Sequence, residues 1–210
     1  MWLAALSTAR SASAETLDRV VASIENIAIT QSDVEREYRF EHFPDARWPP
    51  PPPDGAALEQ VCKRLTYQKL LALEEGTNPP EAADLANAAA ERLASIRKGF
   101  GPEEDFQAAL RTLGMGEREL LERIAEQQRI LRLIDQRLRP AAVLTVPEIE
   151  TYYRETFVPE YTRRNVGPAP TLAEVETQIR EILVEKKIDQ LLGKWLEELA
   201  SSRRVRFHSF

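Results

Sequence analysis

The stretch Tyr152–Leu183, YYRETFVPEYTRRNVGPAPTLAEVETQIREIL, contains two helical segments joined by a short linker. Glycine and proline in the linker, residues 165–170, must break the chain, because proline lacks a backbone N–H and restricts the residue before it. Thr171 and Glu174 then have the spacing of a capping box, in which two side chains satisfy free amides at the start of a helix. The sequence therefore predicts a returning helix over 171–200.

The predicted helix 171–200 is long and amphipathic. At about 1.5 Å per residue it extends roughly 40 Å, the reach of a whole small domain. We expect it to carry the chain from a distal end back to the N-terminal strands. Its apolar positions recur at helical spacing: Leu172, Val175, Ile179, Ile182, Leu183, Leu191, Leu192, Trp195 and Leu199.

Both ends of the chain predict β-strands. Residues Arg19–Thr30, RVVASIENIAIT, are rich in valine and isoleucine and predict a hairpin, with Glu25-Asn26 in the turn because asparagine tolerates positive φ. A single hairpin is marginally stable in water. The last residues, RRVRFHSF, alternate apolar with polar side chains and predict a third strand over 204–208. We expect the two ends to meet in one small sheet.

The sequence between these strands is typical of helices. The expected start signals are capping boxes or early prolines, namely Ser32 with Glu35, Asn78-Pro79, Gly101-Pro102, and Thr145 with Glu148. The expected stops are glycines: Gly76, Gly99 and Gly114. The predicted fold is mainly α, a multi-helix module with a small sheet, closed by a long C-terminal helix. Its helices are expected near 32–43, 56–75, 79–98, 102–113, 116–138, 146–157 and 171–200.

Composition and charge limit the classes of function. The 210 residues are 43% hydrophobic and 30% charged, which is typical of a soluble globular chain. A formal charge of −6 argues against a general nucleic-acid or anionic-membrane binder. The single cysteine, Cys62, excludes an internal disulfide and a cysteine-rich zinc site, and its helical context predicts a buried thiol.

Residues 1–14, MWLAALSTARSASA, differ in character from the rest of the chain. They combine a short apolar stretch with Ala12-Ser13-Ala14, a pattern suited to signal peptidase. We expect a signal peptide here and hence export to the periplasm, with an ordinary chain terminus as the alternative. No apolar run reaches the ~20 residues of a membrane span, so no stable membrane insertion is expected.

Residues that carry chemistry are scarce. His42 and His208 are the histidines, and neither belongs to a metal-binding motif. Glycine-rich phosphate loops and nucleophile elbows are absent from the sequence. Adjacent carboxylates such as Glu74-Glu75 point in different directions on a helix and indicate solvated faces. The sequence therefore predicts a protein that is not an enzyme, with no catalytic residue, no metal site and no cofactor.

Aromatic side chains fall in two groups that can bind a polypeptide. The candidate binding residues are Tyr38, Phe40 and Phe43 near the start, and Tyr152, Tyr153 and Phe157 before the linker. Adjacent tyrosines on one helix cannot both face one core, so at least one can reach a surface or groove. Ordinary packing against the long helices is the alternative for each of them.

The five prolines Pro49–Pro53 cannot be helical and favour an extended polyproline conformation. They predict a stiff loop between two helices. The alternative is a docking ligand for an aromatic groove, with Trp48 as its anchor.

Several motifs resemble SurA-type periplasmic chaperones and related parvulin-linked chaperones. RVVASIENIAITQSDVE, with Ile29-Thr30 and Ser32-Asp33, is similar to the hairpin and capped helix that open these proteins. FQAALRTLGM with ERELLERIAEQQRI resembles their next helix pair, and LTVPEIETYYRETFVPEY their exit helix. The segment from Leu172 to Phe207 resembles their closing helix and strand. The resemblance covers most of residues 18–207, and the order of the motifs is more specific than any one of them.

The chain departs from this family at the linker. Family members usually carry a parvulin prolyl-isomerase domain with paired histidines between the two halves, and the segment from Arg164 to Thr171 has no room for one. The resemblance implies a single SurA-N-like chaperone domain over 15–210, a helical cradle without isomerase activity. It also implies unfolded outer-membrane or secreted polypeptides as partners, held without ATP.

Two other functions stay open at this point. The chain can be an adaptor that docks one folded partner through Pro49–Pro53 or through its long helix, or it can be a cryptic prolyl isomerase. Its assembly is expected to be a monomer or a helix-swapped homodimer, because a short linker before a long helix can send that helix to a neighbour. No nucleic-acid partner is expected.

Overall fold

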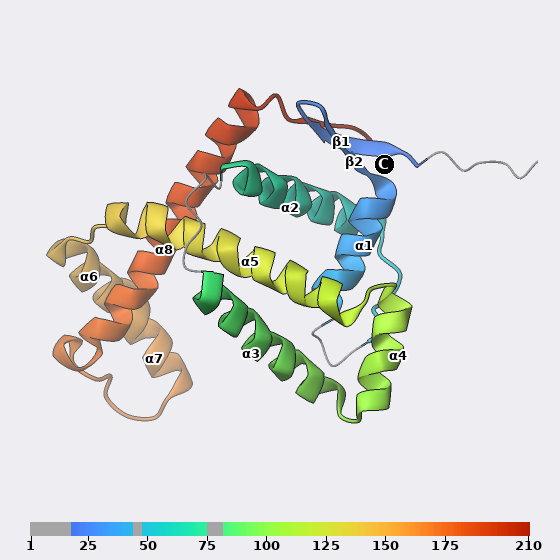
Figure 1. Cartoon of the computed structure of the whole chain (residues 1–210). Coiled ribbons are helices and arrows are strands. Elements are labelled where there is room, and N and C mark those ends of the chain that lie inside the picture. The colour runs from blue at the N-terminus through green and yellow to red at the C-terminus, as the bar shows by residue number, and fades with distance from the viewer. Residues whose placement is uncertain (1–17, 44–47, 75–81) are drawn as a thin grey trace, which may run out of the picture.

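The computed structural model describes residues 18–43, 48–74 and 82–210, and it is mainly α-helical with a small antiparallel sheet (Figure 1). This confirms the predicted fold class. In chain order the elements are β1 (Val20–Ile24), β2 (Ile27–Thr30), α1 (Gln31–His42), α2 (Gly55–Glu74), α3 (Ala82–Phe100), α4 (Glu103–Leu113), α5 (Glu117–Leu138), the 3-10 turn η1 (Arg139–Ala141), α6 (Val146–Tyr152), the π-helical turn η2 (Tyr153–Phe157), α7 (Val158–Arg164), α8 (Leu172–Ser202) and β3 (Arg206–Phe207).

The N-terminal hairpin and the C-terminal strand meet in one sheet, as predicted. The strand order is β2-β1-β3, and β1 pairs antiparallel with both neighbours. The pairing of β3 with β1 places Phe207 opposite Ala22 and Arg206 opposite Ser23. The hairpin turn lies at Glu25-Asn26, but the positive φ, 49°, belongs to Glu25 and not to Asn26.

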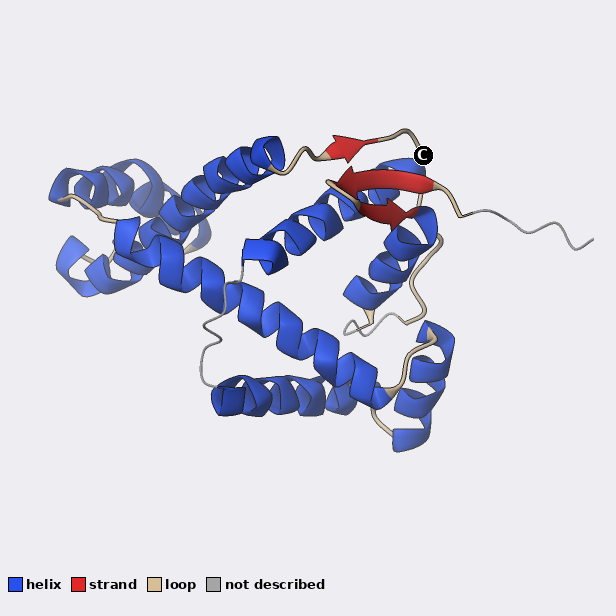
Figure 2. Ribbon diagram, turned by 45° about the horizontal axis from the view of Figure 1, so that its top comes forward, coloured by secondary structure: helices blue, strands red, loops and turns tan. Residues whose placement is uncertain are grey.

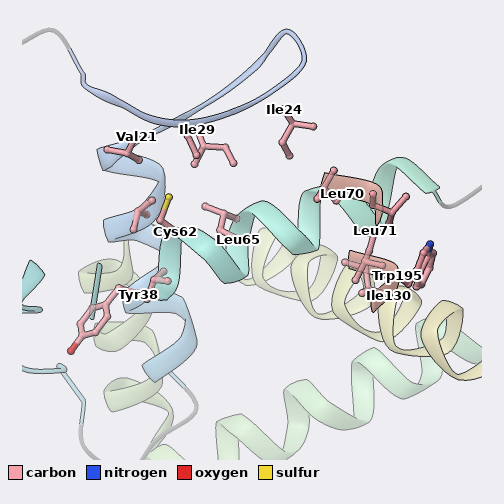
Figure 3. Close-up of a cluster of buried hydrophobic side chains, with 14 of the residues drawn as sticks. Val21, Ile24, Ile29, Tyr38, Cys62, Leu65, Leu70, Leu71, Ile130 and Trp195 are labelled. Atoms are coloured by element: carbon pink, nitrogen blue, oxygen red, sulfur yellow. The ribbon is translucent and has the colours of Figure 1, made fainter. Parts of the chain in front are cut away.

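The sheet is stabilised by a hydrophobic cluster beneath it (Figure 3). Val21, Ile24 and Ile29 from the hairpin are fully buried in the same cluster as Leu70 of α2 and Trp195 of α8. The hairpin is therefore supported by helices, which removes the instability of an isolated two-stranded unit. Cys62 lies in this cluster at 2% exposure, so the predicted buried thiol is confirmed.

Two further clusters of buried hydrophobic side chains lie away from the sheet. One joins the end of α1 to α3, α4 and α5, with Phe43 and Phe106 completely buried at its centre. The other is small and contains Ile149 of α6 with Val175 and Ile179 of α8. The α6–η2–α7 segment thus packs on the N-terminal half of α8, at the end of the molecule away from the sheet (Figures 1 and 2).

The first helix begins earlier than expected. Thr30 and Asp33 form its capping box, with the Thr30 hydroxyl accepting from the Asp33 amide at 3.3 Å and the Asp33 carboxylate accepting from the Thr30 amide at 3.0 Å. The predicted box of Ser32 with Glu35 was wrong. Strand β2 runs directly into α1, so the last extended residue is Thr30, and the N-cap must be extended.

Other boundaries were predicted with mixed success. The boxes at Thr145 and Thr171 are present, and Gly114 ends α4 with a left-handed φ of 74°. Gly99 was wrong as a stop, because α3 continues to Phe100 and Gly101 takes the positive φ. The single helix predicted over 146–157 instead changes to a π-helical turn and continues to residue 164. Residues 1–14, Gly76 and Asn78-Pro79 lie outside the described residues.

A pair of leucines tests the importance of the cluster beneath the sheet. Leu70→Ala removes a fully buried side chain and should lower the free energy of unfolding by about 2–5 kcal/mol. Leu131→Ala, at a position that is 59% exposed, should change it by less than about 0.5 kcal/mol. Urea denaturation followed by circular dichroism measures both. Equal losses for the two variants would contradict this packing.

Candidate functional site

Helix α6 is fixed to α8 by the residues at its start. The Glu148 carboxylate accepts from the backbone amide of Thr145 at 2.7 Å and from its hydroxyl at 2.8 Å. It also accepts from the Lys187 ammonium at 3.0 Å, and Lys187 donates to the Val143 carbonyl oxygen at 2.6 Å. One lysine of α8 therefore holds both the helix start and the loop before it.

The hydrogen bonds at this helix start lower the pKa of Glu148. The Thr145 amide, the Thr145 hydroxyl and the Lys187 ammonium, in that order of effect, lower the pKa of Glu148 from its ordinary 4.5 to about 2. The Glu148 carboxylate is therefore ionised throughout the physiological range and remains so in moderately acidic solution.

A groove of about 470 Å³ runs between α6–η2 and α8. Its apolar lining includes Leu144, Tyr152 and Leu183, and charged side chains of both signs lie beside these, among them Glu155 and Lys186. The Lys186 ammonium lies 4.6 Å from the centre of the Tyr152 ring, within the range of a cation–π interaction. The groove is therefore lined by aromatic and aliphatic side chains, with acidic and basic side chains beside them.

The two adjacent tyrosines lie at the start of the π-helical turn and have different neighbours. Tyr153, Phe157 and Tyr161 follow one another at four-residue spacing and stack, with ring centroids 5.9 Å apart in both pairs. The Tyr153 hydroxyl donates to the Pro170 carbonyl oxygen at 2.8 Å, which ties the turn to the linker. Tyr152 instead lines the groove. Tyr152, Tyr153 and Phe157 are all half-buried and pack partly against the cluster that joins α6 to α8.

The first aromatic group lies elsewhere and is buried. Tyr38, Phe40 and Phe43 are only 7%, 4% and 0% exposed. Phe43 packs beside Phe100 and Phe106, and the Arg123 guanidinium lies 4.2 Å from the centre of the Phe40 ring. Phe40 and Phe43 belong to the core cluster of α1, α3, α4 and α5, whereas Tyr38 also lines a pocket beside Pro49–Pro53. The fold leaves the two groups at different ends, since α1 and α6 are well separated (Figure 1).

The polyproline segment packs along α1. Pro50 and Pro53 are half-buried and Pro49, Pro51 and Pro52 are exposed, a pattern that fits the three-residue period of a polyproline helix. The Tyr38 hydroxyl donates to the Pro51 carbonyl oxygen at 3.1 Å. This arrangement fits the predicted stiff loop, and it also leaves three prolines facing solvent.

Sequence reasoning missed several residues of the groove. Leu183 was recognised only as part of an apolar stripe, and Lys186 and Lys187 were not recognised at all. A lysine on a long helix carries no local signal of its partner, and Lys187 finds Glu148 from 39 residues away.

Comparisons with known proteins identify no relative: no family model, curated protein or solved structure matches the chain. Within residues 18–43, 48–74 and 82–210, no helix is both long and apolar enough to cross a membrane. The same residues contain no group of three or more histidine, cysteine, aspartate or glutamate side chains placed to hold a metal ion.

Removal of the Lys187 charge should raise the pKa of Glu148. In Lys187→Met the two Thr145 hydrogen bonds remain, so the pKa should lie between about 2 and the ordinary 4.5. Carbon-detected NMR titration of the carboxyl group measures it. Lys194→Met, an exposed position on the same helix, is the control and should leave the value unchanged.

The same group predicts a dependence of stability on pH. Because the pKa of Glu148 is lower in the folded chain than its ordinary 4.5, its stabilising effect is complete above pH 4.5 and is lost as the pH falls toward about 2. Thr145→Val, which removes the hydroxyl, should weaken this dependence. Thermal unfolding measured at several pH values between 2 and 6 checks it, and identical curves for the variant and the original chain would contradict it.

Proposed function

We propose that the chain is an ATP-independent periplasmic chaperone that holds segments of unfolded outer-membrane or secreted polypeptides in the groove between α6 and α8. The observation that carries this proposal is the groove itself. It places half-buried Tyr152 beside Leu183 in an open channel with charged groups of both signs at its sides. Such a surface accepts apolar and aromatic side chains without selecting one sequence.

The surroundings of the groove support this reading. Val143 and Val146, next in sequence to groove residues Leu144 and Pro147, are 67% and 61% exposed. Apolar surface therefore continues from the groove onto the start of α6 and the loop before it. An extended client has room to place more than one side chain there.

The expected affinity suits a protein that must release its clients. Burial of one apolar side chain is worth about 1.5–3 kcal/mol, and association and ordering consume much of that gain. Binding through one or two side chains is thus weak and exchanges quickly. A holdase needs this property, because its clients have to leave in order to fold.

The sequence supports the same proposal. Its motifs resemble the two halves of SurA-type chaperones without the isomerase domain, and residues 1–14 predict export. We therefore assign the chain no catalytic role, no cofactor and no nucleic-acid partner, and we place it in the periplasm as a monomer or a helix-swapped dimer. The clients are the partners in this proposal.

A second candidate is an adaptor that docks one folded partner. The exposed prolines Pro49, Pro51 and Pro52 favour it, because an extended proline segment loses little entropy on binding. In that case affinity capture would yield one stoichiometric partner, and substitution of these prolines, not of Tyr152, would release it.

Suppression of aggregation tests the chaperone proposal. A denatured outer-membrane barrel is diluted into buffer with several-fold molar excess of the chain lacking residues 1–14, and light scattering is recorded. The unmodified chain should reduce scattering, and Tyr152→Ala should lose most of the effect. The proposal fails if the unmodified chain has no effect at this excess.

A matched tyrosine controls for loss of fold. Tyr67 of α2 is also half-buried and also has a lysine near its ring, with the Lys63 ammonium 5.7 Å from the centroid, but it lies outside the groove. Tyr67→Ala should retain suppression. Circular dichroism checks that both variants are folded. If both are folded and lose the same amount of suppression, the groove is not the binding site for clients.

A further inference from the structure

A buried carboxylate with an unsatisfied oxygen lies between α1, α2 and α5. Glu37 of α1 is only 1% exposed, and one of its carboxylate oxygens accepts from the Arg123 guanidinium of α5. The other oxygen, Oε1, is buried and has no hydrogen-bond partner among the described residues. Most buried side-chain polar atoms have at least one hydrogen-bond partner, because an unmade bond to a desolvated oxygen costs free energy.

Glu37 lines a cavity of about 270 Å³. Its volume is several times the roughly 30 Å³ that one water molecule occupies in the liquid, so it has room for a small organic group. Leu65 and Ile130, both almost fully buried, provide apolar wall, and Gln68 and Gln127 provide amides. The cavity therefore combines a polar end with a surface against which methylene groups can pack.

The charges around the cavity favour a cation. Two of the basic groups are already paired, Arg123 with Glu37 and Arg36 with Asp33. Of the remaining charged lining residues, Glu119 and Glu126 outnumber Lys69, and the cavity as a whole is lined by one more acid than base. Burial, with a smaller effect from Glu41, raises the pKa of Glu37, although Arg123 and Lys69 act in the opposite direction.

We propose that this cavity binds a primary ammonium group on an alkyl stem, either a lysine side chain of a polypeptide or a free alkylamine. A single free carboxylate oxygen matches the compact ammonium better than a guanidinium, which prefers to engage both oxygens at once. The carboxylate turns about a soft terminal torsion, so an entering donor can reach the oxygen that Arg123 leaves free. The stem lies against Leu65 and Ile130.

Titration with n-butylammonium chloride tests the site directly. Amide NMR spectra of the whole chain at pH 7.5 should show saturable shifts for α1, α2 and α5 residues that line the cavity. Neutral n-butanol and sodium chloride at matched ionic strength are the controls and should not reproduce these shifts. Identical shifts with either control overturn the proposal, since apolar packing or salt alone would then explain them.

Three substitutions give effects in opposite directions. Glu37→Gln should reduce the affinity for butylammonium below detection. Glu126→Gln should weaken it by about two- to fivefold, the size expected for one exposed charge. Lys69→Met should strengthen it by a similar factor, because a like charge is removed. Damage to the fold cannot produce tighter binding, so Lys69→Met tests the site even if Glu37→Gln is unstable. Unchanged affinity in both Lys69→Met and Glu126→Gln overturns the proposal.

A peptide pair distinguishes the two sources of the ammonium group. A short acetylated peptide with one lysine is compared with the same peptide carrying norleucine, which keeps the stem and lacks the charge. Tighter binding of the lysine peptide than of butylammonium identifies a polypeptide side chain as the ligand, and the reverse order identifies a free amine. The site lies between α1, α2 and α5, apart from the groove of α6 and α8, so either proposal can fail without the other.

Discussion

Helix α8 buries different parts of its length against different partners, and the arrangement of the whole molecule depends on this. Val175 and Ile179 in its first turns pack on Ile149 of α6, whereas Ile188, Trp195 and Leu199 belong to the cluster beneath the sheet. A helix of 31 residues is about 45 Å long, which is sufficient to connect both regions as one rigid element. Beyond its end, Arg203 pairs with Glu74 of α2 at 2.9 Å and with Glu25 of the hairpin turn at 3.6 Å. The helix therefore fixes the position of the sheet near its C-terminal end and that of α6 along its N-terminal half, with the groove beside its middle.

The two proposed sites differ in their physics as well as in their position. The groove between α6 and α8 is open, with aromatic and aliphatic lining, and suits weak binding of many sequences. The cavity beside Glu37 is polar and more enclosed, so electrostatic interactions within it are less screened by water. A ligand there would be selected for its charge, and a client in the groove for its apolar side chains. If both proposals hold, one chain carries a permissive site and a selective one.

Local signals in the sequence were accurate where a short segment decides its own conformation. Thr145 with Glu148 and Thr171 with Glu174 form the expected capping boxes, and Gly114 takes the expected left-handed conformation. The errors arose where a neighbouring element intervened. Ser32 lost the cap to Thr30 because β2 leads straight into α1, and a π-helical turn replaced the regular helix expected through Phe157. The sequence predicted that the adjacent tyrosines would not both face one core, but both pack partly against the cluster between α6 and α8, and Tyr152 also lines the groove.

Short-range chemistry in the chain specifies which segments are helices, where the linker breaks them, and that residues 20–24, 27–30 and 206–207 form strands. Each of these properties depends on side chains and backbone within a few residues of one another. The partners in the ion pairs between elements are determined only when the helices pack against one another. Lys187 reaches Glu148 across 39 residues, Arg123 reaches Glu37 across 86, and Arg203 reaches Glu74 across 129. Such pairings depend on how the helices cross, and the crossing is fixed by the summed packing of apolar faces, which no single segment encodes.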